Sequence, residues 1–241
     1  IAPSQLAYER GVVQARPLAL QLLDGDLALR GRADLRPSSP RFDLAAQLDH
    51  LRWSAAKDAV PVDASGQLAL AGTFDAWTVQ GALELLRDRQ RARLTLDGRG
   101  DRGHIELAGF HAKTPAGAMT GTGRFAWSPQ LAWTADATLA GLDPGYFAPG
   151  FDGAVSGHVQ SNGSIDTNGV LALHAAADGL SGTLRGRRLG GHGVIDWQAD
   201  VGHADVDLRI GASRVQASGA FGRLLDLQAR FDPLNLNDLL P

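Results

Sequence analysis

Apolar and polar residues alternate with a period of two along most of the chain. In the clearest run, every second position is apolar: Leu131, Trp133, Ala135, Ala137 and Leu139. Successive side chains of a β-strand point to opposite faces, so this pattern predicts strands with one apolar face and one mostly polar face. Helical spacing is nearly absent. Comparable rows lie at 42–48, 68–70, 77–79, 92–96, 105–107, 125–127, 171–175, 195–199, 204–210, 215–217 and 225–231.

Short polar or glycine-containing segments separate these rows. The pairs Asp97-Gly98, Asn162-Gly163 and Asn168-Gly169 are of the kind that accepts positive φ angles, and we interpret them as tight hairpin turns. The strands are therefore expected to pair with their sequence neighbours in an antiparallel sense. With strands of about eight residues and turns of about five, the chain would hold on the order of 18 strands.

A ribbon of hairpins with one apolar face cannot leave that face in water. It can pack on a second sheet as a sandwich, close into a barrel, or curl around something apolar. A flat sheet of more than about ten strands is the least favourable outcome. The sequence thus predicts an all-β fold, a long antiparallel meander of hairpins. Alternation alone does not distinguish an open groove from a closed sandwich, because both hide every second residue.

The meander contains an internal repeat. The segments near 46–72 and 137–163 match at an offset of 91 positions, and a third match, near 229–241, follows at an offset of 92. Chance similarity among glycine-rich alternating strands is the alternative. We expect residues 1–241 to form one elongated, repetitive β-groove segment. Because the chain starts at Ile1 without a methionine or a secretion signal, we also expect it to be cut from a longer protein.

Two short segments break the alternation. Leu142–Phe147 and Leu234–Leu240 each carry Asp or Asn as a possible cap, and a proline follows. They predict one or two single helical turns that fold over a margin of the sheet. The segment Arg36–Pro40, with two prolines and two serines, predicts a loop.

Composition narrows the range of functions. An apolar content of 44% with 20% charged residues describes a folded, water-facing protein. The net charge of -3 argues against a nucleic-acid partner, because phosphate binding requires a surplus of Lys and Arg on one face. The absence of cysteine excludes disulfides and thiolate metal sites. No stretch approaches the roughly 18 uninterrupted apolar residues of a membrane span.

The sequence offers no recognisable catalytic motif. Seven histidines are scattered without metal-binding spacing, although His192 and His203 could neighbour each other across a hairpin. Ser156 stands one position late for a nucleophile elbow, and Gly121-Thr122-Gly123 lacks the helix that a dinucleotide site needs. No carboxylate pair can be nominated for glycoside hydrolysis. We therefore expect no enzymatic activity, no cofactor and no metal site.

Several segments of the second half resemble a known family. Leu184–Gly193, Val206–Val215, Gly219 and Leu234–Pro241 are similar to the repeats of the TamB family, which is related to the AsmA-like proteins. The similarity is strongest over residues 137–241, whereas the earlier part of the chain fits only by pattern.

The resemblance implies a fold and a function. TamB-like proteins are anchored in the bacterial inner membrane by a helix that this chain lacks and extend through the periplasm. They meet TamA, an outer-membrane barrel protein, through a C-terminal region that this chain does not resemble. Their sheet curls into an open apolar trough, the β-taco. The implied function is phospholipid transport toward the outer membrane. The alternative is a scaffold for the assembly and secretion of outer-membrane proteins, with nascent barrel strands as partners.

The physics of an open apolar face is compatible with an acyl-chain cargo. Each methylene removed from water gains about 0.8 kcal/mol, so a long tail gains roughly 10 kcal/mol before ordering costs. Because the lining is uniform, a tail could slide with little change in energy. The residues expected to line this groove are Leu94, Leu96, Ile105, Leu107, Phe125, Trp127, Leu131, Trp133, Leu139, Leu171, Leu173, Ile195, Trp197, Val206, Leu208, Ile210, Leu225, Leu227 and Phe231.

Overall fold

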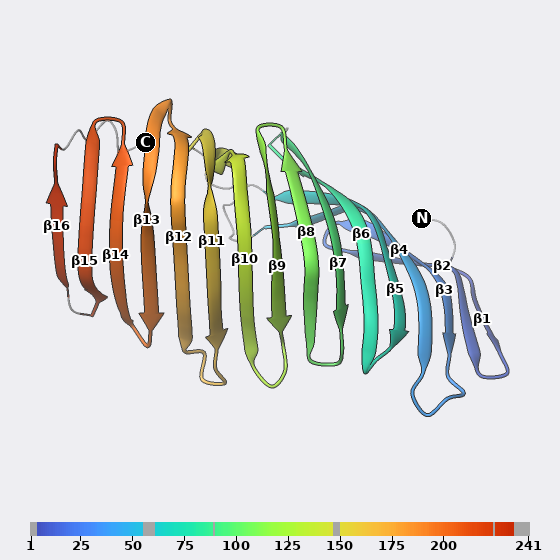
Figure 1. Ribbon diagram of the computed structural model, residues 1–241. Helices are drawn as coiled ribbons and strands as arrows, with labels where there is room; N and C mark the ends of the chain where they lie inside the picture. Colours follow the sequence, from blue (N-terminus) through green and yellow to red (C-terminus); the bar gives the residue numbers. More distant parts are fainter. Residues whose placement is uncertain (1–3, 55–60, 89, 147–149, 224, 234–241) are drawn as a thin grey trace. The chain divides into compact units, whose positions relative to one another are not determined.

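A computed structural model describes residues 4–54, 61–88, 90–146, 150–223 and 225–233 (Figure 1). The chain divides into two units, Ile1–Pro115 (unit 1) and Ala116–Pro241 (unit 2). Unit 1 contains β1 (Leu6–Glu9), β2 (Val12–Leu22), β3 (Gly25–Asp34), β4 (Arg41–Trp53), β5 (Val62–Thr73), β6 (Ala76–Arg87), β7 (Gln90–Gly100) and β8 (His104–Thr114). Unit 2 contains β9 (Gly117–Ala126), β10 (Leu131–Leu142), the 3-10 helix η1 (Pro144–Tyr146), β11 (Gly153–Ile165), β12 (Leu171–Leu184), β13 (Arg187–Gln198), β14 (Val201–Ile210), β15 (Ser213–Gly222) and β16 (Asp226–Phe231).

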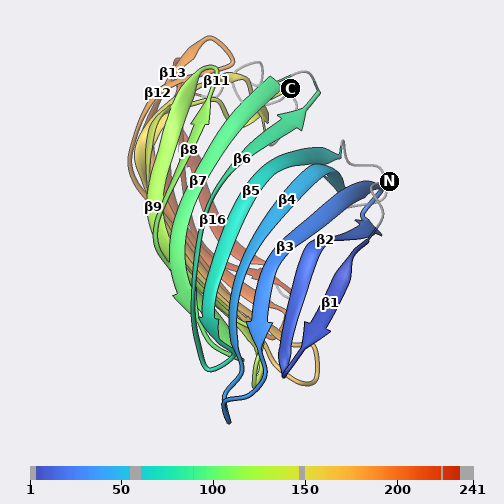
Figure 2. The same cartoon turned by 90° about the vertical axis from the view of Figure 1, so that its right-hand side faces the viewer.

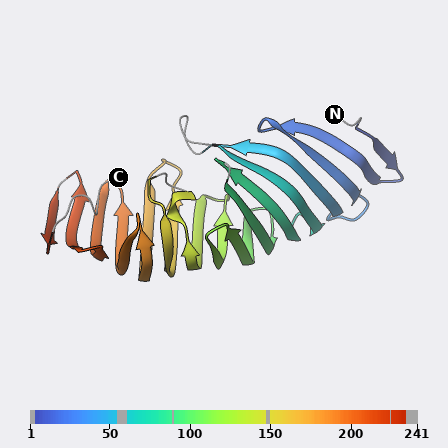
Figure 3. The same cartoon turned by 90° about the horizontal axis from the view of Figure 1, so that it is seen from above.

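Within each unit, every strand pairs with the strand that follows it in sequence, always antiparallel. Among the described residues, no pairing joins β1 to β8 or β9 to β16, so neither unit closes into a barrel. The strands of unit 1 bend along their length, as β3 to β7 show in Figure 2. Figure 3 shows the same meander from above. The prediction of an open, all-β antiparallel meander is confirmed.

Most strands are longer than the predicted eight residues or so. In addition, two of the expected turns lie inside strands. Asp97-Gly98 belongs to β7 and Asn162-Gly163 to β11, so these two turn predictions are wrong. Asn168-Gly169 does lie in the turn between β11 and β12, where the Asp166 N–H donates to the carbonyl of Val170 over 3.1 Å. The segment Arg36–Pro40 is a loop, as predicted.

The same bulge occurs once in each unit. It interrupts the register between β4 and β5 in unit 1 and between β10 and β11 in unit 2. In the first, the N–H of His50 (φ 54°) donates to Ser65 Oγ over 3.0 Å; in the second, the N–H of Gly141 (φ 62°) donates to Ser156 Oγ over 2.9 Å. Both pairs of residues are 91 positions apart. A serine hydroxyl thus replaces the sheet partner that each bulged amide has lost.

One of the two predicted helical turns is present as η1, which contacts β11. Its Tyr146 is 5% exposed, and Leu142 at the end of β10 and Val155 on β11 are 6% and 5% exposed. The turn therefore covers this margin of unit 2, as the sequence pattern suggested. The other expected turn, Leu234–Leu240, lies outside the described residues.

Candidate functional site

The apolar residues of unit 1 lie on one face of its sheet. Because directly paired residues point to the same side, the register assigns one face to each strand position. Buried positions on this face are few and include Leu48 and Val79, which are 9% and 5% exposed. The others are partly exposed. Four rows run across β3 to β8: Ala33-Phe42-Gly72-Trp77-Gly100-Ile105, Gly31-Leu44-Leu70-Val79-Gly98-Leu107, Leu29-Ala46-Leu68-Gly81-Leu96-Phe110 and Leu27-Leu48-Gly66-Leu83-Leu94-Ala112.

The apolar face of unit 2 is arranged differently. Two central rows consist of small residues except at Val159, Val206, Ile195 and Leu227, and we call them the small-residue band. Large side chains flank the band, in the row that contains Trp133, Leu173 and Trp197 on one side and in the row that contains Leu139 and Leu208 on the other. The band consists of Gly123-Ala135-Ser161-Ala175-Ile195-Ala204-Gly219-Leu227 and Gly121-Ala137-Val159-Ala177-Gly193-Val206-Ala217-Ala229.

The nineteen residues expected to line a groove divide between these faces. Leu94, Leu96, Ile105 and Leu107 lie on the apolar face of unit 1. The remaining fifteen belong to unit 2, thirteen on the apolar-face positions of its strands, with Trp127 and Leu225 just outside strand ends. None of the nineteen is buried. Within each unit, the described residues form a single sheet, and no second sheet covers its apolar face.

The expected lining leaves out much of unit 1. Leu29, Leu44, Leu68, Leu70 and Leu83 occupy the same apolar face as Leu94 and Leu96. The signal that finds them is the period-two alternation, which the first half of the chain carries as clearly as the second. The nineteen expected residues therefore cover only part of the apolar face of unit 1, whereas the strand pattern extends across all of it.

Aromatic rings cover glycines on the apolar faces of both units. A methyl group added to Gly100 would overlap the ring of Trp77, and one added to Gly163 would overlap the ring of Trp133. Gly202 is covered in the same way by the ring of Phe221. Each ring lies over the backbone of the next strand, where only glycine leaves room, an arrangement that supports strand pairing at glycine positions.

The indole N–H groups of these faces have different partners. Trp77 Nε1 donates to the carbonyl of Asp101 over 3.0 Å, and Trp133 Nε1 donates to Ser161 Oγ over 3.1 Å. Trp197, which packs against Phe221 with ring centroids 5.6 Å apart, has no hydrogen-bond partner among the described residues. The described residues thus leave one donor on the apolar face of unit 2 unused.

The opposite faces carry hydrogen-bonded polar pairs. On β14 and β15, Arg214 Nε donates to Asp207 Oδ1 over 3.0 Å, and this guanidinium lowers the pKa of Asp207 to about 2. On β10 and β11, the Gln160 amide and the His158 ring lower the pKa of Asp136 below its usual value. These contacts join neighbouring strands, so the polar pairs of the solvated face help to keep the strands in register.

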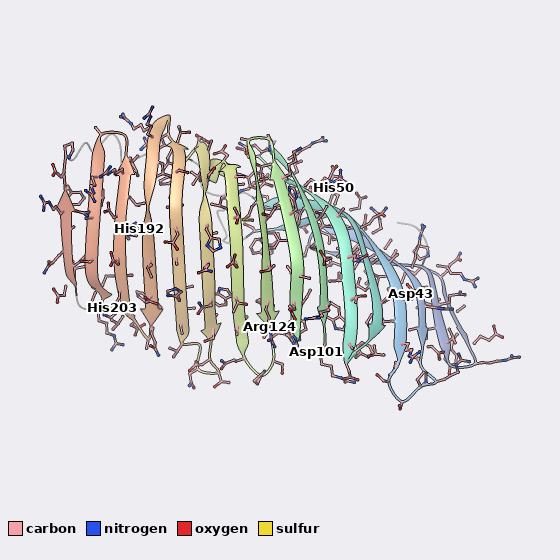
Figure 4. All side chains as sticks on the ribbon, viewed as in Figure 1. Asp43, His50, Asp101, Arg124, His192 and His203 are labelled. Carbon is pink, nitrogen blue, oxygen red and sulfur yellow. The ribbon has the colours of Figure 1, made fainter. Side chains whose placement is uncertain are left out.

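The polar groups do not assemble a reactive centre. His192 stands opposite Asp207 and His203 opposite Asp196, so the two histidines are not neighbours across the hairpin, and Figure 4 shows them at different heights on β13 and β14. The expectation that they could meet is wrong because four residues of register separate them. In the described part of the chain, no three His, Cys, Asp or Glu side chains are grouped so as to hold a metal. There, too, no helix combines the length and hydrophobicity of a membrane crossing.

The comparisons with known proteins agree with the fold. Residues 11–241 match the family model for the N-terminal domain of TamB. The match includes residues 11–136, which the sequence motifs placed in this family by pattern alone. The searches of curated proteins and of solved structures gave no match. Since the family model covers nearly the whole chain, the chain belongs to the TamB family, whose role is in outer-membrane assembly.

Proposed function

We propose that this chain is a periplasmic segment of a conduit that moves phospholipids toward the outer membrane along its apolar faces. The observation that supports the proposal is exposure: every residue of the expected lining stays at least partly accessible, although all are large and apolar. A face of this extent is unusual on a soluble protein and marks a surface that meets an apolar partner.

The small-residue band of unit 2 suits an acyl chain better than a flat leucine surface does. Glycine and alanine have little or no side chain, so the surface of the band lies lower than the two rows of larger side chains beside it, which include Trp197 and Leu208. A tail laid on the band would contact both rows and the floor. Its burial would gain about 0.8 kcal/mol per methylene, and the similar residues along the band would allow movement between neighbouring positions.

The family supplies the setting of this proposal. The anchor in the inner membrane and the contact with a TamA-like outer-membrane barrel protein would belong to parts of the protein outside this chain. The conduit needs no catalytic group, cofactor or metal, since binding and sliding involve no bond changes.

Native mass spectrometry of the purified chain tests the proposal. We expect co-purified phospholipid, or uptake of added fatty acid by the delipidated chain. A matched variant, Leu208→Asp, places a charge on the apolar face, and its control, Gln228→Asp, places the same charge on the polar face of β16. Loss of lipid only in the first supports the proposal. A delipidated, folded chain that takes up no lipid or fatty acid contradicts it.

A second candidate function is a scaffold for strands of outer-membrane barrel proteins. The observation that favours it is β16, which pairs on one side only within the described part of the chain and whose residues are all exposed. Such an edge can accept an added strand through backbone hydrogen bonds. Photo-crosslinkers at Gln228 and Ala217 discriminate the two: adducts with nascent protein at the edge favour the scaffold, and adducts with lipid at the band favour the conduit.

A further inference from the structure

On the apolar face of unit 2, Trp197 differs from Trp133. The N–H groups of Trp77 and Trp133 are satisfied by Asp101 and Ser161 within the protein, whereas that of Trp197 has no partner in the described part of the chain. A polar group at a surface that becomes covered loses its water, and an unpaired donor there is costly. Trp197 therefore suits an occupant that brings an acceptor with it.

Trp197 lies near the end of β13, at the accessible end of the apolar face of unit 2. Near the turns that join β9 to β10, β11 to β12 and β13 to β14, large apolar side chains are markedly exposed: Phe125 by 42%, Leu131 by 37%, Ile165 by 36% and Ile195 by 40%. At the opposite end of β10 and β11, η1 covers the margin. These two strands are thus open at one end, and Trp197 stands at the same end of β13.

We propose that the Trp197 indole N–H donates to an ester or phosphate oxygen of a bound phospholipid, so that the head end of the lipid lies at this open margin. The inference rests on the proposed function and adds an orientation to it. An acyl lipid has an apolar tail and ester or phosphate oxygens that only accept hydrogen bonds. The tail complements the apolar face, and an oxygen complements the N–H donor of Trp197.

The length of the strand agrees with this orientation. From Trp197 to Leu189, β13 extends eight residues, or about 27 Å at about 3.4 Å per residue. One lipid tail fills half of a hydrocarbon core about 30 Å thick, or roughly 15 Å. A tail whose head end is held at Trp197 therefore fits within the length of β13.

The test uses three probes that share one tail: dodecane, methyl laurate and dodecylphosphocholine, the last below its micelle concentration. The first has no acceptor, the second an ester and the third a phosphate. Indole N–H resonances of the full chain are followed by NMR during each titration, and the variants Trp197→Phe and Trp133→Phe assign the two signals. We expect a downfield shift of the Trp197 signal with an oxygen-bearing probe and not with dodecane, while the Trp133 signal stays close to its position.

Affinity provides the second measurement. Trp197→Phe keeps an aromatic ring and removes the donor, so it should weaken binding of the oxygen-bearing probe by about three- to tenfold and leave dodecane binding unchanged. Trp133→Phe, which removes a donor already used within the protein, is the matched control and should not change the preference between probes.

The outcomes separate this inference from the function on which it rests. If all three probes bind and the Trp197 signal responds equally to each, the orientation is wrong and the conduit stands. The same holds if Trp197→Phe retains the full preference for oxygen-bearing probes. If none of the probes binds, the conduit itself is contradicted. The ester and phosphate arms identify which oxygen the indole meets.

Discussion

Unit 1 and unit 2 share one alternating pattern, yet their apolar faces differ. In the central rows of unit 1, leucines are frequent, such as Leu44 on β4 and Leu68 and Leu70 on β5. The corresponding rows of unit 2 are mostly glycine and alanine, with large residues on both sides. Alternation decides which face a side chain occupies, whereas the volume of the side chain decides how far it stands above the sheet. The two units therefore predict different responses to substitution.

The largest effect is expected in unit 1. Val79→Asp places a carboxylate at a position that is 5% exposed, between Leu70 and Gly98. An unpaired buried charge costs about 3–5 kcal/mol, so unit 1 should unfold or lose most of its stability. Urea unfolding followed by circular dichroism measures this. A variant as stable as the parent would contradict the enclosed position of Val79.

In unit 2, the same charge should affect binding more than folding. Leu208 is partly exposed, so the carboxylate of Leu208→Asp can stay hydrated and the cost in unfolding free energy should be about 1 kcal/mol. Acyl-chain affinity should fall at least tenfold, because a tail can no longer cover that position without desolvating the charge. Fluorescence titration with a fatty acid checks the affinity. Unfolding comparable to that of Val79→Asp would contradict the distinction between the units.

The glycine positions allow a smaller, more local test. The methyl group of Gly163→Ala would overlap the Trp133 ring and lie 2.7 Å from the Ala172 carbonyl oxygen, so the substitution should cost about 1–3 kcal/mol. Gly190→Ala is the matched control, because its nearest contact would be the Leu180 carbonyl at 3.6 Å, an ordinary van der Waals distance. Thermal unfolding of both variants is the measurement. Equal losses would show that the ring does not matter.

The two bulges compare the units directly. Ser65→Ala and Ser156→Ala each remove one hydroxyl that accepts a hydrogen bond from a bulged amide, so each should cost about 0.5–1.5 kcal/mol. Ser181→Ala, on a neighbouring strand of unit 2, is the control and should change stability less. If the losses of stability at Ser65 and Ser156 differed strongly, the two bulges would contribute unequally to stability although they occupy equivalent positions 91 residues apart.

The smallest effect concerns pH. Arg214 holds the pKa of Asp207 at about 2, below the unfolded value of about 3.9. The sign follows from linkage: the stabilisation is present above about pH 4 and is lost as the pH falls toward 2. Because both groups are solvated, the change should be small. Acid unfolding of Asp207→Asn should show a weaker pH dependence over that range, and an unchanged profile would contradict this account.

Much of the fold follows from the sequence alone, for a local reason. A period of two is a property of consecutive residues, so the strands, their antiparallel pairing and the apolar lining at Trp133 or Leu208 can be predicted without knowing the partners. Gly98 and Gly163 are different. Each looks like a turn residue, but Gly163 is required by a tryptophan on the next strand, and nothing local in the sequence reports that contact.

The candidate site was predictable in kind and less so in detail. The residues of the lining alternate, and they fall on apolar-face positions as expected. The small-residue band depends on the register of eight strands at once, since Ala135, Ala175 and Ala204 fall in one row only through pairing. The unused donor of Trp197 likewise depends on which groups surround it. Both features are set by register, which periodicity does not specify.

Pairing only between successive strands has a consequence for how the chain reaches its folded state. Every contact between strands closes a short loop, so the entropy lost in forming each hairpin is modest and does not wait for distant segments to meet. Folding can begin at any hairpin and spread outward, with stability growing by one nearest-neighbour term for each strand added. A chain of this kind can become ordered from one end while the remainder is still emerging from a translocation pore.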